Sequence, residues 1–294
     1  MPVVTRIRDV LAGNLVPFGL ATIVLAGRIY ARAAVLRKIG VDDYLLTLGW
    51  LCALVNCILA VLATKYGLAT HQQEVPLALI PTFRKLTFAT YITYQFSLGF
   101  TKLAISVLYL HALGISKSAC REVYALIAFV FVYTIALTVQ LVFSCVPIRK
   151  TWHSEVAGYC YSLEPGFWAH FVCNLVSDIW LIAFAAPRVW RIKLPTRQKV
   201  VLLATITLGW VVVIAAIVRA VLVSMVINAV DRTWASRDPS IWTSVELNVA
   251  ILCAAVPALK PLLTRFVPDT VTPRSNLYLH SIPSLVSSDT RSDG

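Results

Sequence analysis

The chain has 294 residues, of which 59% are hydrophobic and 14% charged, and its mean hydropathy is +0.77. A soluble domain carries about a quarter charged residues, so this composition excludes a water-covered globule and indicates lipid as the main solvent. The net charge of +12 would suggest a nucleic-acid partner in a soluble protein. Here the basic residues flank apolar runs, where they set topology and contact anionic lipid headgroups. Nucleic acid is therefore not an expected partner.

Seven apolar runs are each long enough to cross a bilayer, which takes roughly 20 residues. In chain order they cover 10–26, 44–64, 86–110, 123–146, 167–186, 200–227 and 241–263. Backbone polar groups in lipid must be hydrogen-bonded internally, so each run is expected to be a helix. The first run has no convincing cleavage site and is expected to act as its own signal anchor. The sequence predicts an all-α, seven-transmembrane helix bundle over 1–266, in the endoplasmic reticulum or the plasma membrane.

Lysine and arginine are divided unequally between the two ends of these runs. The side of the membrane that the chain reaches after the first run carries 15 of them, and the opposite side carries 9. Lys102 and Arg219 are left inside the runs. The richer side is cytosolic, which predicts the N-terminus outside and the C-terminus in the cytosol. Residues 267–294 are rich in Ser, Thr, Pro and Asp and lack an apolar period, so they are predicted to form a disordered cytosolic tail.

Apart from Lys260 at the cytosolic end of the last run, four charged residues lie inside the runs, at a cost of about 2.5–3.5 kcal/mol each on insertion scales. They are Lys102, Asp178, Arg219 and Glu246. Asp178 and Arg219 fall at similar depth on adjacent helices, by the rise of about 1.5 Å per residue, which predicts an ion pair between them. Asn174 lies one turn above Asp178 on the same face. Such a pair fits a structural contact as well as a functional site.

Glu246 and Lys102 allow two interpretations each. An unpaired Glu246 would be a proton donor, whereas a Glu246 bonded to Arg219 would join a structural triad. Lys102 shares a helix face with Gln95 and is expected to snorkel toward the cytosolic end, where Asp42 and Asp43 begin the second helix. The alternative is that Lys102 supports a ligand pocket.

Aromatic and polar residues in the outer half of the runs are candidates for such a pocket. Aromatic walls with a few polar groups suit an apolar ligand, although interfacial aromatics often serve only as belt residues. The candidate pocket residues are Tyr91, Gln95, Trp242 and His170. A lone histidine near an interface is more often an amphipathic side chain than a ligand-binding one, which is the alternative for His170.

Two of the seven cysteines, Cys145 and Cys160, lie at the outer end of the fourth run and in the loop after it. In an oxidising compartment a disulfide between them would close this loop over the bundle. The alternative is that Cys145 remains buried in the fourth helix. The chain contains no CxxC and no Cys/His metal spacing, so no metal ion is expected.

Short motifs follow one another along nearly the whole chain. They include GRIYAR at 27–32, IGVDDYLL at 39–46, KLAISVLYL at 102–110, FSCVPIRKTW at 143–152, WTSVE at 242–246 and CAAVPALKPLL at 253–263. Together they resemble the fungal rhodopsin-domain family, which includes membrane proteins of fungal toxin clusters and receptor-like surface sensors. The resemblance implies a fungal source and a seven-helix bundle. No retinal or other cofactor is expected, because no lysine lies between Ile241 and Leu259.

Three functions fit these features. The favoured one is a cofactor-free cyclase or isomerase of secondary-metabolite biosynthesis, with Glu246, Asp178 and Arg219 acting as catalytic acid, base and cation on a hydrophobic small molecule. A receptor-like sensor of a hydrophobic molecule comes second, because the short cytosolic loops leave little surface for a signalling partner. A proton-coupled transporter comes third, because the sequence shows no inverted repeat. Cytosolic or pathway-enzyme partners are left open.

Overall fold

The computed structural model describes residues 2–112, 117–153, 155–162, 164–191, 196–227 and 229–259. The predicted tail and Lys260 lie outside these ranges. Seven long α-helices occur within the described part of the chain, together with the single-turn helix α7 (Arg232–Ala235). The long helices are α1 (Pro2–Tyr30), α2 (Val41–Lys65), α3 (Ile80–Ala112), α4 (Lys117–Val142), α5 (Glu164–Arg191), α6 (Thr196–Ile227) and α8 (Arg237–Ala255).

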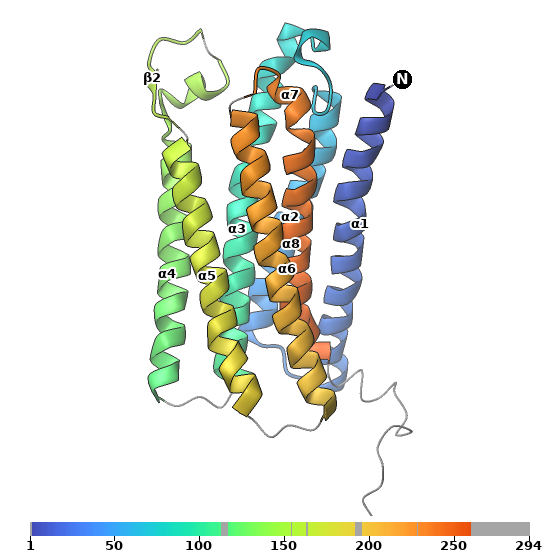
Figure 1. Cartoon of the computed structure of the whole chain (residues 1–294), viewed down its shortest axis with the longest axis vertical. Coiled ribbons are helices and arrows are strands. Elements are labelled where there is room, and N and C mark those ends of the chain that lie inside the picture. Colours follow the sequence, from blue (N-terminus) through green and yellow to red (C-terminus); the bar gives the residue numbers. More distant parts are fainter. Residues whose placement is uncertain are drawn as a thin grey trace, which may run out of the picture.

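The long helices lie side by side in one bundle, with neighbours in the sequence running in opposite directions (Figure 1). The helix α2 packs on α3, and α8 packs on α1, α6, α2 and α3. The N-terminus, α7 and the short strands lie at one end of the bundle, here called the outer end (Figure 1). The opposite, inner end carries the turn between α1 and α2. Short connections and antiparallel neighbours are the arrangement that the seven apolar runs predict.

Five of the described helices have the length and apolar composition needed to cross a membrane. They cover Arg6–Ala34, Val41–Lys65, Lys117–Val142, Glu164–Arg188 and Leu203–Ile227. Their outer faces expose large apolar side chains such as Ile23, Ile58 and Ile214, as expected of lipid-facing surfaces. The other two long helices, α3 and α8, bring buried polar residues into the bundle, including Lys102 and Glu246. The fold is therefore an all-α membrane fold.

Close approach of α2 and α3 depends on a glycine. A Cβ added at Gly49 would lie 2.8 Å from Thr101 Oγ1 and 3.2 Å from the carbonyl oxygen of Ser97. The Ser97 hydroxyl donates to the Gly49 carbonyl at 2.8 Å. Small residues at helix interfaces allow this kind of close backbone packing inside membranes, where lipid supplies no hydrophobic driving force.

An arginine clamps three helices together at the inner end. Arg28 donates from Nε to Asp43 at 2.7 Å, from Nη2 to Asp42, and from Nη1 to the Ala254 carbonyl at 2.6 Å. Arg32 adds a second contact to Asp42 at 3.1 Å. These bonds join α1, α2 and α8. Asp42 and Asp43, toward which Lys102 was expected to extend, are thus bonded by Arg28 and Arg32 instead.

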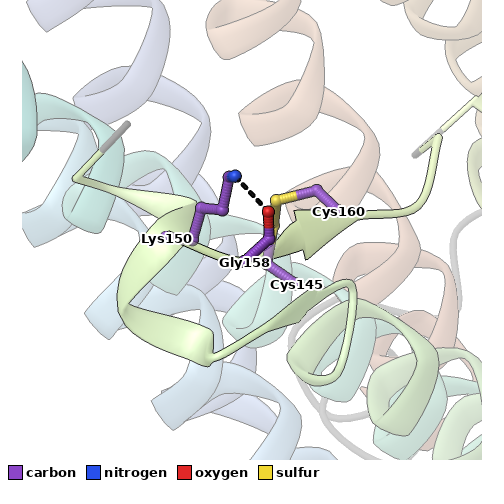
Figure 2. The surroundings of a disulfide bond; sticks show 4 residues. All are labelled: Cys145, Lys150, Gly158 and Cys160. Atoms are coloured by element: carbon purple, nitrogen blue, oxygen red, sulfur yellow. Dashed lines mark hydrogen bonds between the residues drawn. A yellow bond between two sulfur atoms is a disulfide. The ribbon is translucent and has the colours of Figure 1, made fainter. Parts of the chain in front are cut away.

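The outer end carries a disulfide-closed hairpin, formed by β1 (Cys145–Val146) and β2 (Tyr159–Cys160). Cys145 lies opposite Cys160 in the antiparallel pair and is joined to it by a disulfide (Figure 2). Lys150 donates to the Gly158 carbonyl across the hairpin (Figure 2). A Cβ at Gly158 would lie 2.3 Å from the Val146 carbonyl oxygen, so only glycine fits this turn. Cys145 is therefore beyond the end of α4, not inside it.

Asp231 organises the connection between α6 and α8. Its carboxylate caps α7 through the Trp234 amide and also accepts from the His71 ring at 2.8 Å, from the Thr233 hydroxyl and from the Gln72 amide. Partial burial raises the pKa of Asp231, but these hydrogen bonds outweigh burial and leave the pKa below its ordinary value. The carboxylate is therefore ionised near neutral pH and ties the α2–α3 connection to α7.

Candidate functional site

Glu246 lies at the centre of a buried polar network. Its carboxylate accepts hydrogen bonds from Arg219 Nε at 2.6 Å, from the Tyr94 hydroxyl at 2.9 Å and from Asn174 Nδ2 at 3.1 Å. The four residues come from α8, α6, α3 and α5, and all are almost fully buried. One guanidinium and two neutral donors thus converge on this carboxylate, and the hydrogen bond from the guanidinium is the charge-assisted one. Glu246 is thus the acceptor of the network.

Lys102 forms the second charged centre. Its ammonium group lies 2.9 Å from Asp178 Oδ1, and it donates to both the backbone and the side-chain oxygen of Asn174 and to Ser177 Oγ, at 2.7–2.8 Å. Asn174 also bonds Glu246, so it links the two ion pairs. The central network consists of Tyr94, Lys102, Asn174, Ser177, Asp178, Arg219 and Glu246.

The predicted ion pair between Asp178 and Arg219 is wrong. Asp178 is paired with Lys102, and Arg219 with Glu246. The expected snorkelling of Lys102 toward the inner end is also wrong, since its ammonium group bonds α5 within the bundle and the side chain is 3% exposed. Axial spacing gives the depth of a residue but not the direction in which it faces around the helix, and that direction decides the partner.

The remaining candidates are divided between the network, its surroundings and the pocket described below. His170 packs its ring 5.6 Å from that of Tyr94, and Gln95 accepts from the Thr138 hydroxyl at 2.7 Å. His170, on α5, thus packs against the network, whereas Gln95, on α3, is bonded to α4. Tyr91 lines the pocket. Trp242 is half-buried on α8 and, among the described residues, belongs neither to the network nor to the pocket lining.

A pocket of about 80 Å³ lies between α2, α3, α6 and α8, on the outer side of the network. Arg219 and Tyr94 line its inner end, and Leu68 and Ser236 line its outer end. Its walls are formed by small, apolar and hydroxyl side chains, namely Ala60, Ala63, Phe83, Thr87, Thr90, Val223, Val226, Pro239, Ser240 and Thr243, together with Asn56 and Tyr91. This lining suits a small, mainly apolar molecule.

The pocket brings together a cation and hydroxyl groups, but its described lining contains neither a carboxylate nor a histidine. Glu246 lies behind Arg219, and Asp178 lies beyond it against Lys102. The arrangement can therefore orient and polarise an oxygen-bearing ligand through Arg219. It places neither carboxylate of the network against that ligand, so the three predicted catalytic residues do not converge on one cavity.

The sequence did not single out three residues that matter here. Ser177 follows Asn174 by three positions, so helical spacing could have placed both on one face. Tyr94 is one of several aromatic residues in the third apolar run, and nothing in the sequence separates it from Tyr91. Asn56 lines the pocket and donates to the Thr90 carbonyl at 2.9 Å. Its significance depends on packing between α2 and α3, which local pattern does not reveal.

Fold and network together define a multi-pass, all-α membrane protein with ion pairs buried inside its helix bundle. The fungal rhodopsin domain model matches residues 27–265, and the chain belongs to this family. No solved structure matches it.

Three curated relatives place this family membership in context. A SAT4 family membrane protein of Emericella nidulans is 26% identical over 71% of this chain, covering 53% of that relative. The polyenoic acids biosynthesis gene cluster protein Ba17b of Metarhizium anisopliae is 25% identical over 84% of this chain and 71% of its own length. The receptor GIN3 of Arthrobotrys oligospora is 22% identical over 67% of this chain and 46% of its own length. The chain thus spans about half the length of two of them.

Proposed function

We propose that this protein binds a lipophilic small molecule of fungal secondary metabolism within the membrane and acts as a receptor-like sensor of it. The observation that carries the proposal is the pocket between α2, α3, α6 and α8, which ends on the buried Arg219. Apolar walls suit a lipophilic ligand, and one buried cation suits the recognition of its polar group. Membership of the fungal rhodopsin domain family supports a membrane role of this kind.

Relatives support both parts of the proposal. One bears the name of a receptor, and others bear the names of biosynthesis clusters. A sensor that reads a metabolite of its own cluster unites the two. The topology that goes with this function is a seven-span bundle with its N-terminus outside, so that the pocket lies in the outer half and the inner end faces the cytosol.

Catalysis by a cyclase or isomerase is less well supported by the geometry. Such an enzyme needs a proton donor at the substrate, whereas Glu246 accepts three hydrogen bonds and is paired with Arg219. Proton donation by Glu246 would require this ion pair to break and Arg219 to move away from the pocket floor. A binding role uses the side chains in the positions where the structure has them.

A pair of matched substitutions tests the proposed function in a producing strain. Thr87 lines the pocket and Thr207 lies on the exposed face of α6, while each hydroxyl donates to the carbonyl four residues before it. Thr87→Phe is expected to fill the pocket and abolish the transcriptional response of co-regulated genes, without the build-up of a precursor. Thr207→Phe is the control for the same change in bulk and should leave the response intact.

Metabolite profiling decides between sensing and catalysis. If Thr87→Phe causes a new precursor to accumulate while transcript levels stay normal, the protein is an enzyme and the sensing proposal is wrong. An unchanged response in a Thr87→Phe protein that accumulates normally would show that the pocket is not used.

A further inference from the structure

Arg219 lines the pocket, and its guanidinium has a buried donor without an acceptor among the described residues. Its Nε donates to Glu246 at 2.6 Å, while the buried Nη2 has no acceptor among the described residues. The side chain is 2% exposed and its Cζ lies 4.3 Å from the centre of the Tyr94 ring. A buried donor without an acceptor is unfavourable, more so when the group is charged. A ligand oxygen at this position would therefore be stabilised.

The pocket is polar at one end and apolar along most of its length. Its lining on α3 runs from Phe83 to Tyr94, a distance of roughly 16 Å along the helix at 1.5 Å per residue. Arg219 lies at the deep end, and apolar side chains such as Val223 and Val226 follow it toward the outer end. A molecule with one polar head and an apolar remainder matches this order.

The charges around Arg219 indicate which kind of head is favoured. Arg219 is already neutralised by Glu246, and Lys102 by Asp178. A carboxylate head would add a net negative charge to a buried site whose cations are already paired, which is costly at low dielectric. An uncharged carbonyl oxygen accepts from the guanidinium without changing this balance.

We propose that the ligand presents an uncharged carbonyl oxygen, as in a ketone, ester or amide, to the guanidinium of Arg219. This inference rests on the proposed binding function and specifies its ligand class. The head lies on Arg219 beside Tyr94, and the apolar part extends along α3 and α6 toward Leu68 at the outer end.

Photoreactive probes test this head-group preference on the full chain in lipid nanodiscs. The probes are a short-chain methyl ketone that carries a diazirine, the corresponding hydrocarbon and the corresponding carboxylic acid at neutral pH. A hydrogen bond to a charged donor is stronger than one to a neutral donor, so the ketone should label α3 and α6 peptides at least tenfold more strongly than the hydrocarbon, a difference of about 1.4 kcal/mol. The carboxylate should label them less than the ketone.

A double substitution shows whether Arg219 is the donor. Arg219→Met with Glu246→Gln removes both charges together and leaves no unpaired ion. In this variant the ketone and the hydrocarbon should label equally. A ketone preference that persists in a folded double variant would contradict the inference.

Infrared spectroscopy supplies a second measurement on the unmodified protein. The stretch of the bound carbonyl should move to a lower frequency than in lipid, and an unshifted stretch would overturn the proposal.

The outcomes separate the two proposals. Labelling of the pocket by every probe, blocked by Thr87→Phe and unaffected by Thr207→Phe, supports binding even where no probe is preferred. Equal labelling by ketone and hydrocarbon then contradicts only the carbonyl inference, as does stronger labelling by the carboxylate. Absence of labelling by all probes contradicts the binding function itself.

Discussion

At the scale of single residues, the two buried ion pairs carry the energetics of the bundle interior. Removing one member of a buried pair leaves an uncompensated charge and costs about 3–5 kcal/mol, whereas removing both is far less costly. Arg219 and Glu246 form one such pair, and Lys102 and Asp178 form the other. Each pair is therefore expected to behave as a unit when it is mutated.

Double-mutant cycles measure this coupling. We expect Arg219→Met and Glu246→Gln each to lower stability by about 3–5 kcal/mol, and the double variant to recover much of the loss. Lys102→Met with Asp178→Asn should behave in the same way. Thermal unfolding in detergent gives the stabilities, with the folded yield as a second readout.

A cross-cycle provides the control. Arg219→Met combined with Asp178→Asn joins two residues that are not partners, so the losses should add to within about 0.5 kcal/mol, apart from the weaker coupling through Asn174. Strong recovery in this cross-variant, with none in the other two, would restore the pairing that the sequence predicted and contradict the structure.

The charged residues of the site were predictable from the sequence, but their partners were not. A charge inside an apolar run is conspicuous, so Lys102, Asp178, Arg219 and Glu246 are all identified without a structure. Partner choice depends on helix rotation and on side-chain reach. A lysine can extend several ångströms along its helix, and the sequence alone does not determine whether it turns toward α2 or α5.

At the scale of elements, each of the seven apolar runs coincides with a long helix, and the differences lie at their ends. The fourth run was extended to 146, whereas α4 ends at Val142 and the next residues enter the disulfide hairpin. Hydropathy continues through Cys145 and Val146, so it cannot mark this end. The single turn of α7 was not predicted, although an aspartate three residues before Trp234 is a typical N-cap arrangement.

Packing between α2 and α3 is expected to tolerate no side chain at Gly49. Gly49→Val places carbon atoms against Thr101 and the Ser97 carbonyl, and the backbone of α3 cannot yield as a flexible side chain would. Overpacking of this kind costs about 1–3 kcal/mol, so the melting temperature should fall. A glycine on α1 gives the matched control: a Cβ at Gly19 meets nothing within 4 Å, and Gly19→Val should change stability by less than about 0.5 kcal/mol.

Equal melting temperatures for the two variants would contradict the close approach of α2 and α3. A larger loss for Gly19→Val would instead indicate that the outward face of α1 is packed against another chain.

At the scale of the whole molecule, the fold class follows from composition because lipid restricts the available structures. Only helices and closed barrels satisfy backbone hydrogen bonds in a bilayer, and long apolar runs favour helices. Hydropathy is less informative for α3 and α8, whose buried polar residues serve the central network and reduce their apolar character. These two helices are part of the bundle but not among the five described helices that qualify as spans by length and composition.

Orientation is the prediction of the sequence that can be tested most directly, because the chain contains no Asn-X-Ser/Thr glycosylation sequon. Gln72→Asn with Glu74→Thr creates one at exposed positions beside α7, at the outer end. Arg37→Asn with Ile39→Thr creates a matched one in the exposed turn between α1 and α2, at the inner end. Glycosylation occurs in the lumen of the endoplasmic reticulum, whether the protein stays there or moves on to the plasma membrane. The first variant should therefore gain an endoglycosidase-sensitive mass increase, and the second should not. The helix α2 lies between the two sites, so a mass increase in both would rule out α2 as a span. Modification of the inner site alone would invert the topology, and the pocket above Arg219 would then face the cytosol.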